Sequence, residues 1–118
     1  MNMNNFIIYH NPKCSKSRQT LQLLKDKGCE PKIFLYLEEK LSSSMIEEIL
    51  LKLSMEPREL LRKTEEHYKS NGLFNDSLTR QEIIGAMVKF PKLIERPIVI
   101  KDNRAIIGRP PENVLDLM

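Results

Sequence analysis

The chain has 118 residues, with 19 Lys and Arg, 16 Asp and Glu, and a net charge of +3. This length fits one compact domain, and the composition excludes disordered and collagen-like chains. The positive charge is small and scattered, which suits a small anionic ligand and argues against a nucleic-acid surface. No apolar run approaches the roughly 18 residues that cross a bilayer, and the polar start does not predict a signal peptide. We therefore expect a cytoplasmic protein that binds neither membranes nor nucleic acid.

The first third of the sequence predicts a βαβ unit. Phe6–Tyr9 is a short apolar run typical of a buried strand. Residues 16–27 are rich in leucine and good helix formers, and Gly28 is a suitable residue to end that helix. Residues 32–37 alternate polar and apolar side chains, as a second strand would. The crossover between these strands is expected to be right-handed.

The middle of the sequence predicts helices. Ser44 and Glu47 have the spacing of a capping box, and so do Thr79 and Glu82. Pro57 fits the first turn of a further helix. We expect a helical insertion at about residues 43–92.

The final part of the sequence returns to β structure. Residues 97–100 and 105–107 are short apolar runs on either side of a polar turn, a pattern that indicates a hairpin. Pro110 and Pro111 then begin a last short helix. The order is β-α-β, a helical block, then β-β-α, which predicts one α/β domain over residues 1–118 with a helical insertion.

Cys14 lies in the turn between the first strand and the first helix. Free N–H groups and the helix dipole favour an anion at such a place, so a cysteine there ionises more readily than a free one. The basic neighbours Lys13, Lys16 and Arg18 act in the same direction. The alternative is a buried cysteine that fills a small gap in the core. We favour a nucleophilic Cys14.

A catalytic Cys14 would have to be resolved by an outside thiol, for which glutathione is the obvious cytosolic candidate. The second position of a C-x-x-C motif is occupied by Ser17, and Cys29 comes after the far end of the predicted helix, about 20 Å away. A disulfide needs Cα atoms within about 7 Å. Two cysteines and two scattered histidines do not form a zinc site. Residue 20 is threonine, where the loop of small tyrosine phosphatases has arginine.

Three arginines are candidates for binding an oxyanion, because a guanidinium fork suits tetrahedral anions. Arg96 and Arg109 each precede a proline, which favours extended backbone, and they flank the predicted hairpin. Arg62 is expected at the end of a helix. Taken alone, each is more often a surface residue.

With these residues assembled, the chain resembles the arsenate reductase family that works with glutathione and glutaredoxin. The matching segments cover nearly the whole chain in the order of the family: Tyr9-His-Asn-Pro-Lys-Cys14, Ser17-Arg18, Leu60-Leu-Arg-Lys63, Glu95-Arg-Pro-Ile98 and Gly108-Arg-Pro110. Ser15 stands where the best-known member has glycine, and the sequence ends at Met118, a few residues into its last predicted helix, where classical members carry a longer C-terminal tail. These differences resemble a short branch of the family.

The resemblance implies a thioredoxin-like fold with a four-stranded mixed sheet. It implies an enzyme, an oxidoreductase that reduces arsenate to arsenite through a Cys14–arsenic intermediate, with Arg62, Arg96 and Arg109 binding the oxyanion. His10 matches a histidine that helps to ionise the cysteine, although a turn residue bonded to backbone is the alternative. Pro97 matches a cis proline facing the cysteine. The loop residues Asn11, Ser17 and Arg18 are expected to support the site.

No metal or tightly bound cofactor is expected, glutathione is the expected co-substrate, and glutaredoxin is the expected partner of a monomer. Two alternatives have the same fold and no arsenate activity. One is a redox regulator that binds RNA polymerase, although such regulators usually carry the C-x-x-C pair that Ser17 removes. The other is a general thiol-redox protein, against which three converging arginines would argue.

Overall fold

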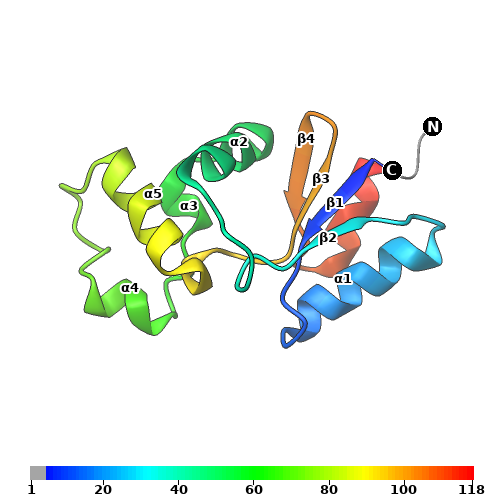
Figure 1. The fold of residues 1–118 in the computed structure, drawn as a ribbon, viewed down its shortest axis with the longest axis horizontal. Helices are drawn as coiled ribbons and strands as arrows, with labels where there is room; N and C mark the ends of the chain where they lie inside the picture. Colours follow the sequence, from blue (N-terminus) through cyan, green and yellow to red (C-terminus); the bar gives the residue numbers. More distant parts are fainter. Residues whose placement is uncertain (1–4) are drawn as a thin grey trace. The chain divides into compact units, whose positions relative to one another are not determined.

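The computed structural model describes residues 5–118 (Figure 1). Its elements in chain order are β1 (Phe6–Tyr9), α1 (Ser15–Asp26), β2 (Lys32–Phe34), α2 (Ser43–Leu53), α3 (Pro57–Leu60), α4 (Glu66–Ser70), α5 (Arg80–Lys89), the 3₁₀ helix η1 (Pro91–Leu93), β3 (Ile98–Lys101), β4 (Arg104–Ile107) and the 3₁₀ helix η2 (Pro111–Leu117). They form two compact units. The first unit contains the chain up to Glu39 together with Arg96–Met118. The second unit, called the helical unit below, is Lys40–Glu95.

The first unit is built on one four-stranded sheet of order β2-β1-β3-β4. Strand β1 pairs parallel with β2 and antiparallel with β3, and β3 pairs antiparallel with β4. The predicted four-stranded mixed sheet is thereby confirmed. In this register Tyr9 lies opposite Ile98, and Ile98 lies opposite Ile107. The end of β1, the start of β3 and the end of β4 therefore meet at one edge of the sheet.

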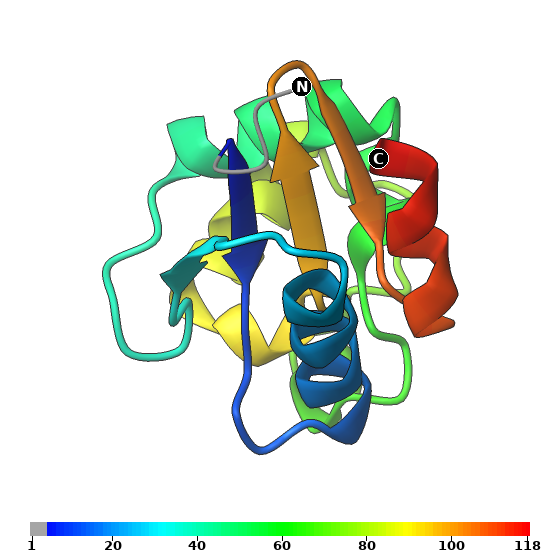
Figure 2. The same ribbon diagram turned by 90° about the vertical axis from the view of Figure 1, so that its right-hand side faces the viewer.

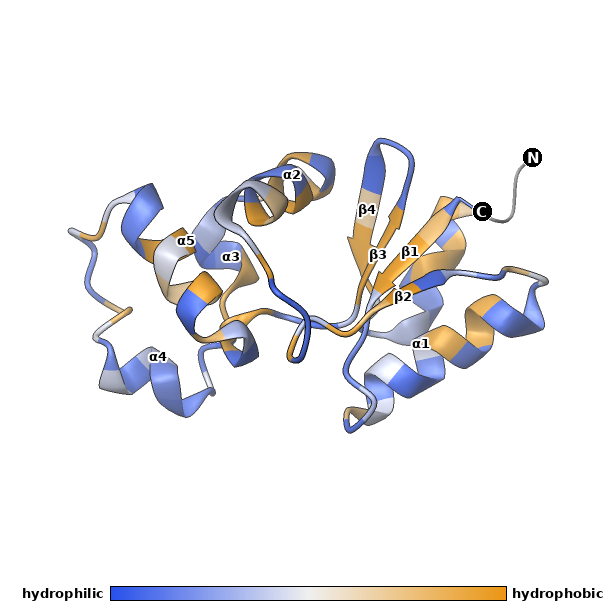
Figure 3. Cartoon of the chain, in the orientation of Figure 1, coloured by the Kyte–Doolittle hydropathy of each residue, from blue (hydrophilic) through white to orange (hydrophobic). Residues whose placement is uncertain are grey.

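The core of this unit lies between the sheet and two helices. Helices α1 and η2 lie in front of the strands in Figure 2, and the strands are largely hydrophobic in Figure 3. The buried side chains of this core are Phe6, Ile8, Leu24, Cys29, Val99, Val114 and Leu117. Burying a large apolar side chain contributes about 1.5–3 kcal/mol. This packing holds α1 against β1 and β3, and so fixes the start of α1 at the edge where β1 ends.

The helical unit confirms one predicted capping box and corrects the other. Thr79 and Glu82 form the reciprocal bonds of a capping box at the start of α5. The pair predicted at Ser44 and Glu47 was wrong, because α2 begins at Ser43 and the Ser42 side chain accepts a hydrogen bond from the Met45 N–H. The Glu47 carboxylate instead accepts a bond from Arg80 Nε at 3.0 Å.

Two further element ends differ from the prediction. Strand β2 ends at Phe34, because the Leu35 carbonyl accepts bonds from the N–H groups of Glu38 and Glu39 and turns the chain. Arg62 does not end a helix: α3 stops at Leu60, and Leu61 forms an isolated bridge with Ile94. Within residues 5–118, no helix is long and apolar enough to cross a membrane.

Candidate functional site

The loop between β1 and α1 places Cys14 at the N-cap of the helix. Asn11 organises this loop: its carbonyl accepts a bond from the Cys14 N–H, and its side-chain oxygen accepts one from the Lys13 N–H, both at 3.0 Å. The Arg18 guanidinium donates to the Pro12 carbonyl at 2.8 Å. These bonds hold the loop, so the Cys14 side chain lies over the first turn of α1.

The pKa of the Cys14 thiol lies below the ordinary value for cysteine. Partial burial opposes this by raising the pKa, but the N–H groups of Ser17 and Lys16 and the nearby Arg96 guanidinium outweigh that effect. The N–H groups at a helix start have no partner within the helix, and the helix dipole favours a negative charge there. The direction of this shift is the one expected from the position of Cys14 in the sequence, and its role as the nucleophile stays a prediction.

Arg96 is the arginine that acts directly on the thiol. It is partly buried, its positive charge lowers the pKa of Cys14, and it also interacts with the sulfur as a hydrogen-bond donor. Its Nε and Nη1 atoms are buried and have no hydrogen-bond partner among residues 5–118. Buried donors without partners are costly, so two of them on one guanidinium indicate a place for an anion. The following peptide bond, to Pro97, is cis as the resemblance implied.

Arg109 lies at the same edge of the sheet as Arg96. The two residues flank β3 and β4, whose ends are paired through Ile98 and Ile107, and the Gly108 N–H donates to the Pro97 carbonyl at 2.9 Å. The Arg109 side chain is exposed. The two arginines flank the hairpin as expected from the sequence, and the strand register places them at one edge of the sheet.

Arg62 belongs to the helical unit. Its guanidinium lies 3.6 Å from a carboxylate oxygen of Glu65 and 3.9 Å from one of Glu95, and it donates to the Lys92 carbonyl at 3.4 Å. The two carboxylates offset its charge, and an anion that binds Arg62 has to compete with them. Its convergence with Arg96 and Arg109 around Cys14 stays a prediction.

His10 and Ser17 form a buried pair beside the loop. Ser17 Oγ lies 2.6 Å from His10 Nδ1 and accepts a bond from the Asn11 N–H at 3.0 Å. The Ser17 hydroxyl thus occupies the position of a resolving thiol and is fully buried. Burial, followed by the positive charges of Arg18 and Lys25, lowers the pKa of His10, so the imidazole is neutral at pH 7. A neutral ring adds no charge beside the thiolate, and the role of His10 in ionising Cys14 stays a prediction.

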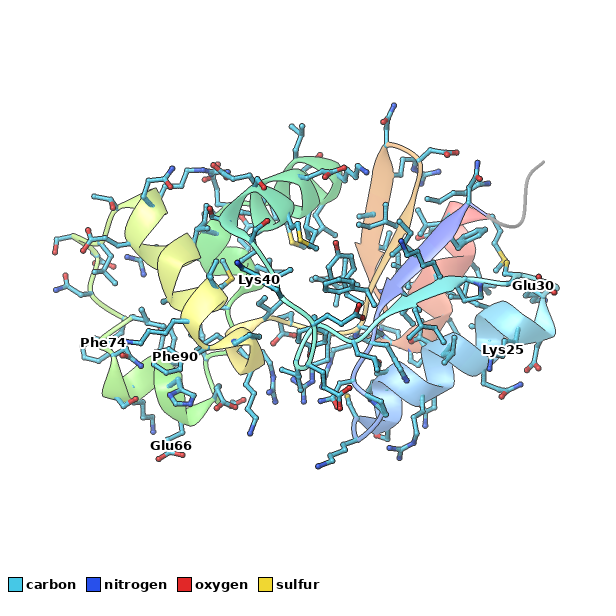
Figure 4. All side chains as sticks on the ribbon, viewed as in Figure 1. Lys25, Glu30, Lys40, Glu66, Phe74 and Phe90 are labelled. Atoms are coloured by element: carbon cyan, nitrogen blue, oxygen red, sulfur yellow. The ribbon has the colours of Figure 1, made fainter. Side chains whose placement is uncertain are left out.

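Cys29 lies beyond the opposite end of α1. The helix has 12 residues, so it spans about 18 Å. Cys29 is 2% exposed, and burial raises the pKa of its thiol. It lines a pocket of about 450 Å³ with Lys25, Gly28, Glu30 and Pro31, and Figure 4 labels Lys25 and Glu30 at this end of the helix. Cys29 is therefore a core residue, too far from Cys14 to form a disulfide with it.

Taken together, the first unit holds a thiol of lowered pKa at a helix start and two arginines at the adjoining sheet edge. Within the described part of the chain, no group of three or more His, Cys, Asp or Glu side chains could hold a metal ion. A nucleophile beside unsatisfied guanidinium donors can attack an electrophile that carries negative oxygens.

Sequence reasoning missed Thr20, which is fully buried on α1. Its hydroxyl lies 2.8 Å from the Lys16 carbonyl and 3.3 Å from the Gly108 carbonyl, so it joins α1 to the segment that carries Arg109. A polar residue within a helix at a position expected to be buried was the only signal in the sequence, and it does not identify the partner.

We expect Arg96→Ala to raise the pKa of Cys14, because the substitution removes a positive charge and a donor from the thiolate. The rate of iodoacetamide alkylation measured against pH reports this pKa, and the unchanged protein should titrate below a free cysteine measured in the same way. Arg104→Ala is the matched control, because Arg104 is exposed and donates to the Asp116 carbonyl. Equal midpoints for Arg96→Ala and the unchanged protein would contradict the assignment.

The lowered pKa of His10 predicts a loss of stability in mild acid. The folded protein binds a proton at His10 less readily than the unfolded chain does. As the pH falls below about 6.5, the unfolded state gains more protons and the free energy of unfolding decreases. Urea unfolding between pH 7.5 and 5.5 should show this slope, and His10→Gln should reduce it. The same slope in both proteins would mean that His10 takes up its proton freely in the folded state.

Comparison with known proteins identifies the family. The model of the ArsC family matches residues 9–117. An arsenate reductase of Haemophilus influenzae is 48% identical over 113 residues, which cover 95% of this chain and 97% of that protein. The Escherichia coli protein YfgD, described as uncharacterized, is 50% identical over 112 residues, 94% of each chain. The solved structure of an arsenate reductase from Vibrio cholerae matches with a TM-score of 0.96 at 43% identity, over 99% of this chain and 100% of that one.

These matches extend over the β1–α1 loop, the helical unit and the hairpin alike, and they confirm the thioredoxin-like fold that the resemblance implied. The cysteine at the helix start and the arginines beside the hairpin are therefore features of a chain that belongs to the ArsC family.

Proposed function

We propose that this protein is an arsenate reductase in which the Cys14 thiolate is the nucleophile. The observation that carries the proposal is the Arg96 guanidinium, which faces a thiol of lowered pKa while its buried Nε and Nη1 atoms have no partner among the described residues. An oxyanion at Cys14 would satisfy these donors. The relatives named arsenate reductase support arsenate as that oxyanion.

The proposed reaction begins when the Cys14 sulfur attacks arsenic. A sulfur–arsenic bond forms, and one arsenate oxygen leaves as water once it is protonated. A glutathione thiolate then attacks the Cys14 sulfur, and the electron pair of the sulfur–arsenic bond stays on arsenic. As(V) becomes As(III) and is released as arsenite, and Cys14 is left in a mixed disulfide with glutathione. The thiols of Cys14 and glutathione thus supply the two electrons that arsenic gains. A glutaredoxin thiol then takes over the glutathione as a mixed disulfide of its own, which releases Cys14 as a thiol.

The chain's own residues favour an external thiol in the second step. Ser17 has no sulfur and bonds to His10, and Cys29 is buried beyond the far end of α1. Glutathione and glutaredoxin are the cytosolic reagents that meet this need, and we place the protein in the cytoplasm, acting as a monomer. A redox regulator or a general thiol reductant would need no oxyanion, and neither accounts for the buried donors of Arg96.

Turnover tests the proposal directly. NADPH oxidation through glutathione reductase, glutathione and glutaredoxin should depend on arsenate when the protein is present, and arsenite should accumulate in step. Cys14→Ser should abolish this activity, because it removes the nucleophile, and Cys29→Ser should retain it, because Cys29 lies outside the site. Disulfide reduction without any arsenate dependence would favour the general thiol reductant. Loss of activity in a folded Cys29→Ser protein would exclude the single-thiol mechanism.

The two other arginines are tested through the KM for arsenate. Hydrogen bonds to charged groups contribute about 1.5–3 kcal/mol, so Arg62→Ala and Arg109→Ala should each raise KM by about tenfold to a hundredfold. The midpoint of Cys14 alkylation should stay unchanged in both, because neither residue contributes to ionising Cys14 in the proposed mechanism.

Each arginine variant has a matched control in its own unit. Arg80→Ala is the control for Arg62, because Arg80 is held by Glu47 and Glu56, and Arg104→Ala is the control for Arg109. A KM for Arg62→Ala equal to that of Arg80→Ala would remove Arg62 from the oxyanion site.

A further inference from the structure

Three segments of the first unit meet at Gly108. The Gly108 N–H donates to the Pro97 carbonyl at 2.9 Å, and the Gly108 carbonyl lies 3.3 Å from Thr20 Oγ1 on α1. Gly108 is buried, and Thr20 is fully buried. Each segment carries one functional residue close by: Arg96 precedes Pro97, Arg109 follows Gly108, and Cys14 is the N-cap of α1.

There is no room for a side chain at this junction. A Cβ atom built on Gly108 would lie 2.6 Å from Thr20 Oγ1, 2.9 Å from Pro97 Cγ and 3.0 Å from Thr20 Cγ2. Contacts below 3.0 Å are essentially never seen for real Cβ atoms. Thr20 is β-branched and sits on a packed helix, and Pro97 is a rigid ring, so neither yields easily. The backbone of Gly108 is not in the left-handed region, so the close approach, not the conformation, requires glycine.

We propose that Gly108 is a positioning residue whose missing side chain sets how closely the Arg96 and Arg109 segments approach the helix that carries Cys14. Any larger residue would push these segments apart. Arg96 lowers the pKa of Cys14 through its positive charge and as a donor, and both effects weaken as the guanidinium and the sulfur move apart. Glycine at this position therefore allows the segments of Arg96 and Arg109 to lie close to the helix that carries Cys14.

Gly108→Ala tests the proposal. The alkylation midpoint of Cys14 should move to higher pH, because Arg96 moves away from the sulfur. The KM for arsenate should rise by roughly tenfold or more, since a misplacement of about 1 Å can cost on the order of 100-fold. The expected change in KM rests on the proposed function, whereas the alkylation midpoint does not. If the unchanged protein shows no arsenate turnover, the proposed function fails and the alkylation test of Gly108 still stands.

Gly85→Ala is the matched control, because Gly85 lies in α5 and a Cβ there meets nothing within 4 Å. It should leave both readouts unchanged. A folded Gly108→Ala protein with the midpoint and KM of the control would overturn the proposal.

A second substitution separates a local clash from general damage. Thr20→Ala, combined with Gly108→Ala, removes the contacts at 2.6 Å and 3.0 Å and leaves the one with Pro97. The alkylation midpoint should return part of the way toward that of the unchanged protein. A midpoint that stays as high as in Gly108→Ala alone would overturn the steric explanation. If Gly108→Ala alone does not fold, the double variant carries the test, with a raised midpoint expected and an unchanged midpoint contradicting the proposal.

Discussion

The antiparallel pairing of β1 with β3 is the constraint on which the site depends. It aligns Tyr9 with Ile98, and the pairing of β3 with β4 aligns Ile98 with Ile107. The loop after β1 carries the cysteine, and the segments beside the hairpin carry two arginines. A slip of one residue between β1 and β3 would place Ile8 and Val99, which now share the buried face, on opposite faces of the sheet. The hydrophobic core and the position of the arginines are therefore set by the same pairing.

Within this frame, the site combines features that are individually costly. The thiol is partly buried, and two donors of a guanidinium are buried without partners among residues 5–118. The positive charge of Arg96 stabilises the negative charge that forms when Cys14 ionises, and the N–H groups at the start of α1 stabilise it further. The remaining unsatisfied donors explain why the site should favour an anion over a neutral ligand. The His10–Ser17 pair supports the loop through the hydrogen bond that Ser17 accepts from the Asn11 N–H, and its neutral imidazole adds no charge.

Much of this arrangement could be predicted from the sequence, because it follows from local patterns. The strand Phe6–Tyr9, the hairpin and the capping box at Thr79 are each encoded within a few residues. The N-cap at Ser42 was missed, since the local pattern favours Ser44, which has Glu47 three residues later, whereas Ser42 has Met45 there. The contact of Thr20 with Gly108 joins residues 88 positions apart, and no local pattern encodes such a contact. The unpartnered atoms of Arg96 are likewise a property of the folded chain alone.

The length of α1 also has a consequence for how the oxidised protein can be recognised. Because the helix keeps Cys14 and Cys29 apart, and these are the only two cysteines of the chain, any disulfide that Cys14 forms joins it to another molecule. Oxidation at Cys14 therefore adds mass, whereas an internal disulfide would remove two hydrogens and leave the mass almost unchanged. An intact mass spectrum can thus measure the fraction of the protein that carries another molecule on Cys14.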